Sequence, residues 1–293
     1  MFAVLCRSPR NTSHQRNTTD RRRLDRRTEV DMSDAASQIL AADIPSVARG
    51  HDKGEIVRRI RKDGFCIVPD LISQTQCRTM GSLLRRFSRE EKHVNLRPSG
   101  HQRVLHLAMK NRMFLDLVTH PLLLAVWRDY LGEDMICSSL TGNTLWPGCT
   151  EQYWHVDHPY WTMAEPYPVQ LPLGAQTIWM IDEFTFENGA TAGIAGSHRQ
   201  SSLPRLGSAW TDEATIFTGR RGSAIFMDGA LWHTSRPNFA RAMRCAVLVK
   251  FIRGFCVTQE DMRMQLAAIE QPSETVQFLF GAKQYVPTRG FPY

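Results

Sequence analysis

The sequence lacks the features that define several classes of protein. No run of about 18 apolar residues occurs, which argues against a membrane-spanning helix. The first ten residues, MFAVLCRSPR, hold too short an apolar stretch for a secretory signal peptide. Seven cysteines are spread along the chain without a Cys-x-x-Cys pair, which favours reduced thiols over a disulfide framework or a zinc site. We therefore expect a cytoplasmic protein with no membrane partner.

Positive charge is not spread evenly along the chain. The net charge is +7, but residues 1–31 hold eight arginines against four acidic residues, so little excess remains elsewhere. We expect residues 1–45 to be a disordered basic tail without a nucleic-acid partner, and residues 46–293 to form one domain. A basic arm and a targeting peptide are alternatives. We favour either a start codon assigned before the true one at Met32 or a merely solvated tail. The four acidic residues argue against a targeting peptide, because such peptides avoid acidic residues.

The first half of the domain has helical periodicity. Residues 52–64 place apolar side chains on one stripe and end at a glycine, after which residues 65–69 read as a short buried strand. Ser73 and Gln76 form a capping-box signature that opens a helix. A further helical region, 112–132, is broken at His120-Pro121.

After residue 134 the pattern changes to short, apolar or β-branched runs between turns rich in proline and glycine. The runs are 135–140, 176–181, 221–227 and 244–251. Their spacing predicts an antiparallel sandwich or barrel. Residues 258–270, with Thr258 as cap, and 273–281 then return to helix. The expected fold class is mainly β with flanking helices.

The sharpest chemical motif is His155-Val156-Asp157. Side chains two residues apart on a strand share a face, so an imidazole and a carboxylate would project together into the interior. They are two of the three ligands in the facial triad of non-haem iron oxygenases. With ten histidines in the chain, a surface ion pair is an alternative explanation for this motif alone.

A third ligand and an anion-binding cation can be sought downstream. His233 follows a strand-like run, although a lone histidine is more often held in the core by hydrogen bonds. Arg244 heads the strand after it, and a hairpin would bring that strand beside His233. The guanidinium suits a carboxylate, and the hydroxyl of Ser235 could share it. Arg236 and Arg241 are competing cations in the loop between.

In order along the chain, four segments resemble the phytanoyl-CoA dioxygenase-like family of Fe(II)/2-oxoglutarate-dependent oxygenases. These segments are RKDGFCIVPDLIS, QYWHVDH, FENGATAGIAGSHR and GSAIFMDGALWHTSRPNFARAMR. The second carries the family's Gln-x-x-His-x-Asp pattern and the fourth its distal histidine and arginine. One departure is Ala195, where the family's turn usually has proline. The resemblance runs from about Gly54 to Gly281.

The resemblance implies a double-stranded β-helix, or jelly roll, with helices at both ends of the chain. Fe(II) would be bound by His155, Asp157 and His233. The distal carboxylate of 2-oxoglutarate would be bound by Arg244 with Ser235, and O2 would be the second cosubstrate. Two further cofactor-binding positions carried over from the family are Gln152 and Trp179.

The substrate is expected to be a small molecule or natural product, hydroxylated with release of succinate and CO2. Asp157 favours hydroxylation, or a desaturation or ring-forming variant, over halogenation, because related halogenases have a small residue in place of the carboxylate. Desaturation, ring formation and a non-catalytic jelly-roll binding protein are the alternatives. Aromatic and imidazole side chains beside the proximal ligands could contact the substrate, namely Tyr153, His158, Tyr160 and Trp161. Lys110, Arg112 and Arg205 could meet an anionic substrate, or be merely solvated.

Overall fold

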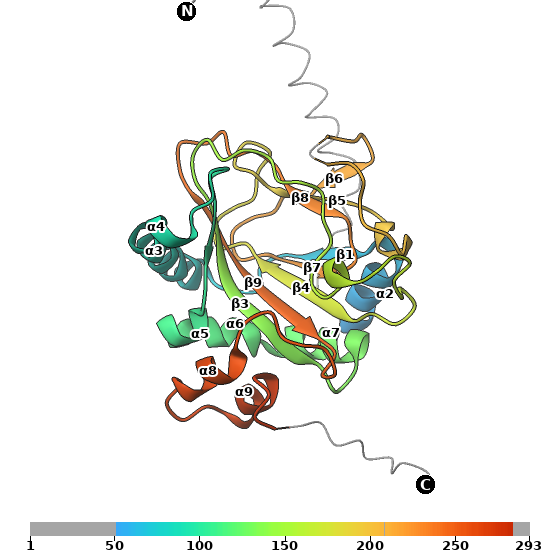
Figure 1. Ribbon diagram of the computed structural model, residues 1–293. Helices are drawn as coiled ribbons and strands as arrows, with labels where there is room; N and C mark the ends of the chain where they lie inside the picture. Colours follow the sequence, from blue (N-terminus) through green and yellow to red (C-terminus); the bar gives the residue numbers. More distant parts are fainter. Residues whose placement is uncertain (1–50, 208, 284–293) are drawn as a thin grey trace, which may run out of the picture. The chain divides into compact units, whose positions relative to one another are not determined.

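A computed structural model describes residues 51–207 and 209–283, and within them a jelly roll of two antiparallel sheets (Figure 1). The predictions for the tail, including the alternative start at Met32, lie outside these residues. The larger sheet has the strand order β1-β7-β4-β9-β3-β2 and the smaller β6-β5-β8. The strands are β1 (Phe65–Val68), β2 (His101–Val104), β3 (Ile136–Leu145), β4 (Gly174–Trp179), β5 (Thr191–Ile194), β6 (Ala214–Ile216), β7 (Ala224–Asp228), β8 (His233–Ser235) and β9 (Arg244–Ile252).

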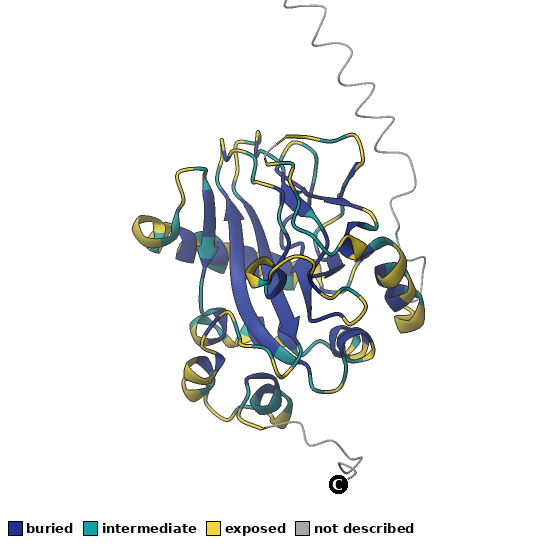
Figure 2. Cartoon of the chain, turned by 45° about the vertical axis from the view of Figure 1, so that its right-hand side comes forward, coloured by how far each residue is buried: buried dark blue, intermediate teal, exposed yellow. Residues whose placement is uncertain are grey.

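The larger sheet separates two apolar cores, and alternation along β9 shows the division. Cys245, Val247 and Val249 face the helices, whereas Ala246 and Leu248 face the smaller sheet. Side chains of even number on β9 therefore point between the sheets. This face of β9 begins with Arg244 and carries Lys250 near its other end, so two cations lie at opposite ends of the inner space. Figure 2 shows both sheets as buried.

Helices cover the outer face of the larger sheet. They are α2 (Lys53–Asp63), α3 (Gln74–Glu90), α4 (Lys92–Asn95), α5 (Leu107–Lys110), α6 (Leu115–Val118), α7 (Pro121–Leu131), α8 (Met262–Ala267) and α9 (Glu274–Leu279), with 3-10 turns at Arg112–Phe114, Tyr160–Thr162 and Ser197–Arg199. Of the described helices, none is both long and apolar enough for a membrane crossing.

The local sequence explains where the helices begin and end. Gly64 ends α2 with φ of 87°, a left-handed conformation that favours glycine. The predicted capping box is confirmed at α3, where Ser73 and Gln76 each accept from the other's backbone N–H. The break predicted at His120-Pro121 is confirmed as well, because Pro121 is the first residue of α7.

The prediction that Thr258 caps the next helix is wrong. The N–H groups of Gln259 and Glu260 instead bond to Ser138 on β3, so this segment bends beside the sheet and is not helical. Asp261 is the N-cap of α8 and accepts a hydrogen bond from the N–H of Met264 at 2.9 Å. The helix therefore begins only where the chain leaves β3.

Two expectations about strands near the site are also wrong. His155 lies on no regular strand, and its only ladder contact is an isolated bridge to His233. The hairpin expected between His233 and Arg244 does not form. The strand β8 pairs with β5 in the smaller sheet, and β9 lies between β4 and β3 in the larger one. His233 and Arg244 thus come from opposite walls of the jelly roll.

Candidate metal and cosubstrate site

Two histidines and one aspartate converge between the sheets. Ligand atoms of His155, Asp157 and His233 lie within 4.8 Å of one another, the one such cluster found in the described part of the chain. Paired backbone hydrogen bonds of 3.0 Å join His155 to His233. The N–H of Asp157 donates to the carbonyl of Gly229 at 2.7 Å, which ties the loop after His155 to the turn before β8. The backbone thus fixes all three positions.

The two imidazoles are held in the form that binds metals. The Nδ1 atom of His155 lies 2.9 Å from the carbonyl of Tyr153, and that of His233 lies 2.8 Å from the carbonyl of Leu231. A carbonyl can only accept, so each Nδ1 carries the proton and each Nε2 keeps a free lone pair. Burial, with the neighbouring histidine, lowers the pKa of His155 to about 3, and burial also lowers the pKa of His233. Both rings are neutral near pH 7.

Asp157 presents one engaged and one free oxygen. Its Oδ1 accepts a hydrogen bond from Nζ of Lys250 at 2.6 Å. Its Oδ2 is buried without a hydrogen-bond partner and lies 3.8 Å from Nε2 of His233. Burial acts to raise the pKa of Asp157, but Lys250 and the two histidines outweigh it and lower the pKa to about 2. The carboxylate is therefore ionised, with Oδ2 directed at the histidines.

Arg244 is a buried cation with unused donors. It is 1% exposed, its Nη2 donates to the carbonyl of Gly189 at 2.6 Å, and its guanidinium lies 4.1 Å from the ring centroid of Phe184. Burial lowers the pKa of Arg244 to about 10, so it stays charged near pH 7. Its Nε and Nη1 have no partner, and buried donors are normally paired. An anion is the partner that such donors require.

The other three predicted cosubstrate contacts, Ser235, Gln152 and Trp179, have different outcomes. Ser235 is buried on β8, and its hydroxyl lies 3.4 Å from Oε1 of Gln152, which lines the cavity. Trp179 is wholly buried, but on the face of β4 that packs against the helices. Since Ile178 and not Trp179 faces the smaller sheet, the carried-over role of Trp179 does not fit its position.

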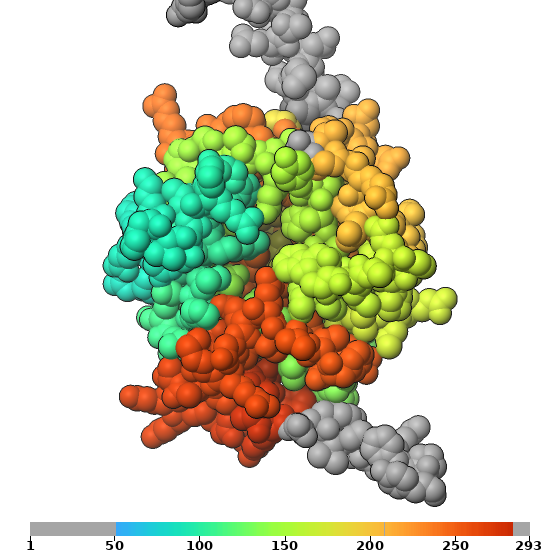
Figure 3. All heavy atoms as spheres, viewed as in Figure 1, coloured from blue at the N-terminus to red at the C-terminus, as the bar shows by residue number. Residues whose placement is uncertain are grey.

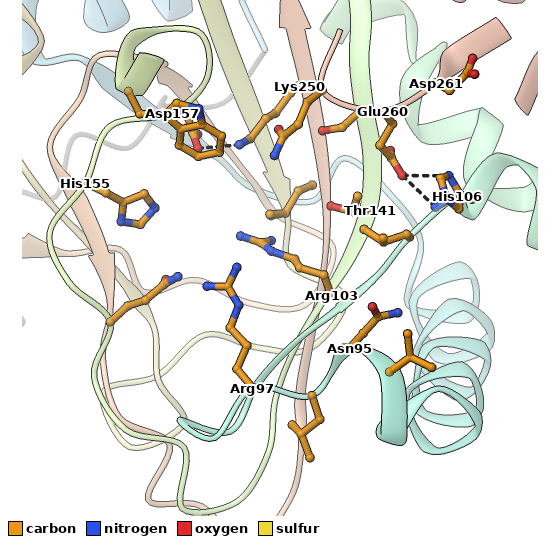
Figure 4. A pocket seen from close by; sticks show the side chains of 18 of the residues that line it. Asn95, Arg97, Arg103, His106, Thr141, His155, Asp157, Lys250, Glu260 and Asp261 are labelled. Atoms are coloured by element: carbon orange, nitrogen blue, oxygen red, sulfur yellow. Dashed lines mark hydrogen bonds and ion pairs between the residues drawn. The ribbon is translucent and has the colours of Figure 1, made fainter. Parts of the chain in front are cut away.

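A cavity of about 900 Å³ opens onto the triad (Figures 3 and 4). His155 and Asp157 line it, together with Lys250. Two arginines that the sequence analysis missed, Arg97 and Arg103, extend into it from the opposite wall (Figure 4). Arg103 has its Nη1 buried without a partner. Burial lowers its pKa to about 10, with Asp157 acting to raise it and Arg97 to lower it.

The predicted substrate contacts divide into two groups. Tyr153 and Trp161 line the cavity and are 69% and 43% exposed. Tyr160 does not line it, because its ring is buried in a separate apolar cluster and its hydroxyl accepts from the N–H of Leu173. His158 does not line it either, and its Nε2 lies 2.7 Å from the carbonyl of Val257.

The cations suggested for an anionic substrate are also elsewhere. Lys110 pairs with Glu91 and Arg205 with Glu165, and Arg112 does not line the cavity. The competing cation Arg236 stacks on the rings of Phe186 and Trp210 at 4.1 and 4.5 Å. Lys250 could have been predicted as a second inward-facing cation, because it lies six residues after Arg244 and therefore on the same face of β9. No comparable signal marks Arg97 or Arg103.

A buried carboxyl supports the turn that carries His233. Asp228 accepts hydrogen bonds from the hydroxyl of Tyr130 at 2.5 Å and from the N–H of Ala230 at 2.6 Å. Burial nevertheless raises the pKa of Asp228 from 3.8 to about 6. The native state therefore holds this proton more tightly than the unfolded chain does. Its contribution to stability is full below pH 4 and is lost as the pH rises through 6.

Asp228→Asn should remove this pH dependence. The free energy of unfolding of the variant, relative to the natural protein, should rise by up to about 3 kcal/mol between pH 4 and pH 7. Urea unfolding of both proteins at the two pH values measures the difference. An equal difference at both would show that Asp228 does not titrate in this range.

Fold and site together define a jelly-roll protein with a candidate metal site of two imidazoles and one carboxylate. The family model described as Phytanoyl-CoA dioxygenase (PhyH) matches residues 60–246, and the chain belongs to this family. The matched segment contains His155, Asp157, His233 and Arg244.

Curated relatives carry names of dioxygenases. "Dioxygenase af480" of Aspergillus fumigatus is 27% identical over 149 residues, which are 51% of this chain and 47% of the relative, so the chain matches about half the length of that protein. "Ectoine dioxygenase" of Nocardia farcinica is 24% identical over 265 residues, 77% of this chain and 88% of the relative. The family model and both of these relatives are therefore named as dioxygenases.

Solved structures share the fold. HygX from Streptomyces hygroscopicus, solved with nickel and 2-oxoglutarate bound, has a TM-score of 0.59 at 16% identity and covers 70% of this chain and 89% of its own. The non-heme alpha ketoglutarate dependent epimerase SnoN, from nogalamycin biosynthesis, has a TM-score of 0.57 at 17% identity, covering 68% and 82%. At these identities the likeness establishes the jelly-roll architecture.

Proposed function

We propose that the chain is an Fe(II)- and 2-oxoglutarate-dependent dioxygenase that hydroxylates an unactivated C–H bond of a small-molecule or natural-product substrate. Succinate and CO2 would be the other products. The proposal rests on one observation: three free ligand atoms converge between the two sheets, two of their residues line a cavity, and the inward face of β9 carries a buried arginine with unused donors. Family membership supports it, and so do the metals, nickel and Fe3+, and the 2-oxoglutarate named for the fold's neighbours.

The residues present suit the implied cofactors. Two neutral imidazoles and one carboxylate are the ligand set of non-haem iron oxygenases, and they leave other coordination positions open. The buried Oδ2 of Asp157 lacks any other partner, as a metal ligand should in the absence of metal. The unused donors of Arg244 suit the far carboxylate of a dicarboxylic acid. The pairing of Asp157 with Lys250 keeps the carboxylate ionised.

Each group of the chain then has a defined task. His155, Asp157 and His233 would hold Fe(II), and Arg244 with Ser235 would orient 2-oxoglutarate. When bound, iron, 2-oxoglutarate and O2 supply an oxidant able to remove hydrogen from an unactivated carbon. Tyr153 and Trp161, at the cavity, would position the substrate and limit the access of water to it.

Anaerobic titration of the metal-free protein tests the cofactor assignment. Addition of Fe(II) and then 2-oxoglutarate should produce the weak visible metal-to-ligand charge-transfer band of a chelated 2-oxo acid. Arg205→Ala, a change at an exposed arginine outside the cavity, should leave the band unchanged. If the natural protein binds neither iron nor 2-oxoglutarate, the proposal fails and the hypothesis of a non-catalytic jelly-roll binding protein takes its place.

Product analysis separates hydroxylation from the other outcomes of the same chemistry. A substrate panel is screened by succinate release, with ectoine included because one relative carries that name. Hydroxylation adds one oxygen atom from O2 to the product. Desaturation and ring formation add none and remove two hydrogens, so mass spectrometry under 18O2 distinguishes them.

Lys250→Met should strengthen Fe(II) binding while it slows turnover. The ammonium 2.6 Å from Oδ1 of Asp157 stabilises the metal-free carboxylate and repels a divalent cation at Oδ2. Loss of this charge should raise Fe(II) affinity by about tenfold, which is modest for charges this close. Turnover should fall because Oδ1 no longer holds the carboxylate in place.

Competition with a fluorescent chelator measures the affinity, and succinate release measures the turnover. Lys250→Arg keeps both charge and donor and should stay near the natural values. Weaker Fe(II) binding in Lys250→Met would contradict the argument.

A further inference from the structure

The cavity holds two cations that no protein anion neutralises. Figure 4 shows the guanidinium groups of Arg97 and Arg103 directed into the same space. Neither forms an ion pair or a side-chain hydrogen bond within the described residues. The charge of Arg97 lowers the pKa of Arg103, as expected for neighbouring like charges. Two adjacent guanidinium groups of this kind form a favourable site for an anion.

The carboxylates that line the cavity are already engaged. Asp157 is paired with Lys250. Glu260 accepts hydrogen bonds from the N–H groups of His106 at 2.9 Å and Leu140 at 2.7 Å. Asp261 caps α8. No carboxylate of the cavity lining is therefore left to pair with the two arginines, and an anion from outside the chain can bind them.

The two arginines occupy different depths. The Nη1 atom of Arg103 is buried, and the charge of Arg103 acts on the pKa values of Arg244, His233 and Lys250, so Arg103 lies near the groups assigned to the metal and the cosubstrate. Arg97 is exposed, and its charge reaches none of those three groups noticeably. Arg103 would thus face 2-oxoglutarate, and Arg97 would be left for a ligand that enters after it.

Apolar side chains complete the outer part of the cavity. Val94, Tyr153 and Trp161 all line it and are 68%, 69% and 43% exposed. Large apolar groups exposed together around a cavity mark a binding surface. A ligand that covered them would place an apolar body against the rings, with Arg97 within the same cavity.

We propose that the substrate is an amphipathic acid, a small molecule with an apolar body and a carboxylate that binds Arg97. The inference rests on the proposed function, since it names the substrate class of that site. It differs from the cosubstrate assignment in the arginine used: Arg97 for the substrate, Arg103 and Arg244 for 2-oxoglutarate.

Equilibrium dialysis with matched probes tests this. The full chain, loaded anaerobically with Fe(II) and 2-oxoglutarate, is dialysed against 2-naphthylacetate and, separately, against its uncharged methyl ester. The acid should bind at least about tenfold more tightly, as expected for a charge-assisted hydrogen bond. Arg97→Gln should remove the preference and Arg97→Lys should keep part of it. The matched control Arg205→Gln, a change outside the cavity, should keep all of it.

The outcomes separate this inference from the proposed function. In Arg97→Gln, the KM for 2-oxoglutarate and the charge-transfer band should stay within about twofold of the natural protein, whereas Arg103→Gln should raise that KM. Equal binding of acid and ester, or an unchanged preference in Arg97→Gln, overturns the inference even when the band forms. If the band is absent, the proposed function fails. The acid-to-ester ratio, which needs no turnover, then still decides whether Arg97 selects anions.

Discussion

His233→Ala should abolish Fe(II) binding and reduce turnover by at least about 1000-fold, because loss of a metal ligand must cost more than the 10–100-fold typical of its supporting groups. The ring of His233 cannot be replaced by a neighbour. His155 and Asp157 are the other two members of the cluster, and within the described residues no fourth candidate ligand joins them. Fe(II) titration and succinate release measure the two effects.

A stability measurement shows whether the loss is specific to the metal. Metal at 100 times its Kd should stabilise the natural protein by about 2.7 kcal/mol and His233→Ala not at all. His198→Gln is the control, because His198 is also buried but is not a member of the triad, and its Nε2 contacts the carbonyl of Arg61. Metal-dependent stabilisation that survives in His233→Ala would place the metal elsewhere.

Local sequence patterns predicted several of the elements but not how the strands pair. The capping box at Ser73 and the stop at Gly64 are local signals, and both were predictable. The pairing of β9 with β3 and β4 joins segments far apart in the chain, and no local pattern encodes it. For the same reason Thr258 misled the prediction, since contacts to Ser138 override its capping preference.

The site shows the same division between local and long-range information. His155 and Asp157 were expected to share a face, and they do so through backbone contacts to other loops, not as members of a strand. Trp179 failed because side chains alternate along β4, so an assignment one residue out of register points to the opposite face. Arg103 enters the cavity through the pairing of β2 with β3, and Arg97 lies in the turn before β2, where its N–H donates to the carbonyl of His101. Neither contact can be predicted from the arginines themselves.

Arg244→Met should raise the KM for 2-oxoglutarate by about 100-fold and leave Fe(II) affinity within about twofold. Two charge-assisted hydrogen bonds from Nε and Nη1 would be lost, and each is worth about 1.5–3 kcal/mol. A loss of about 3 kcal/mol lowers the affinity for 2-oxoglutarate by about 100-fold. Because binding of the cosubstrate and not its chemistry is affected, kcat at saturating 2-oxoglutarate should change much less than KM.

The stability of the ligand-free variant gives this prediction a second, independent test. A buried cation with unused donors destabilises the fold, and methionine of similar size removes that cost while giving up one hydrogen bond to Gly189. Arg244→Met should therefore unfold at a urea concentration close to that of the natural protein. Arg244→Lys should keep part of the affinity, because an ammonium preserves the charge but not the planar pair of donors. A large loss of stability with an unchanged KM would mean that Arg244 supports the fold instead of binding the cosubstrate.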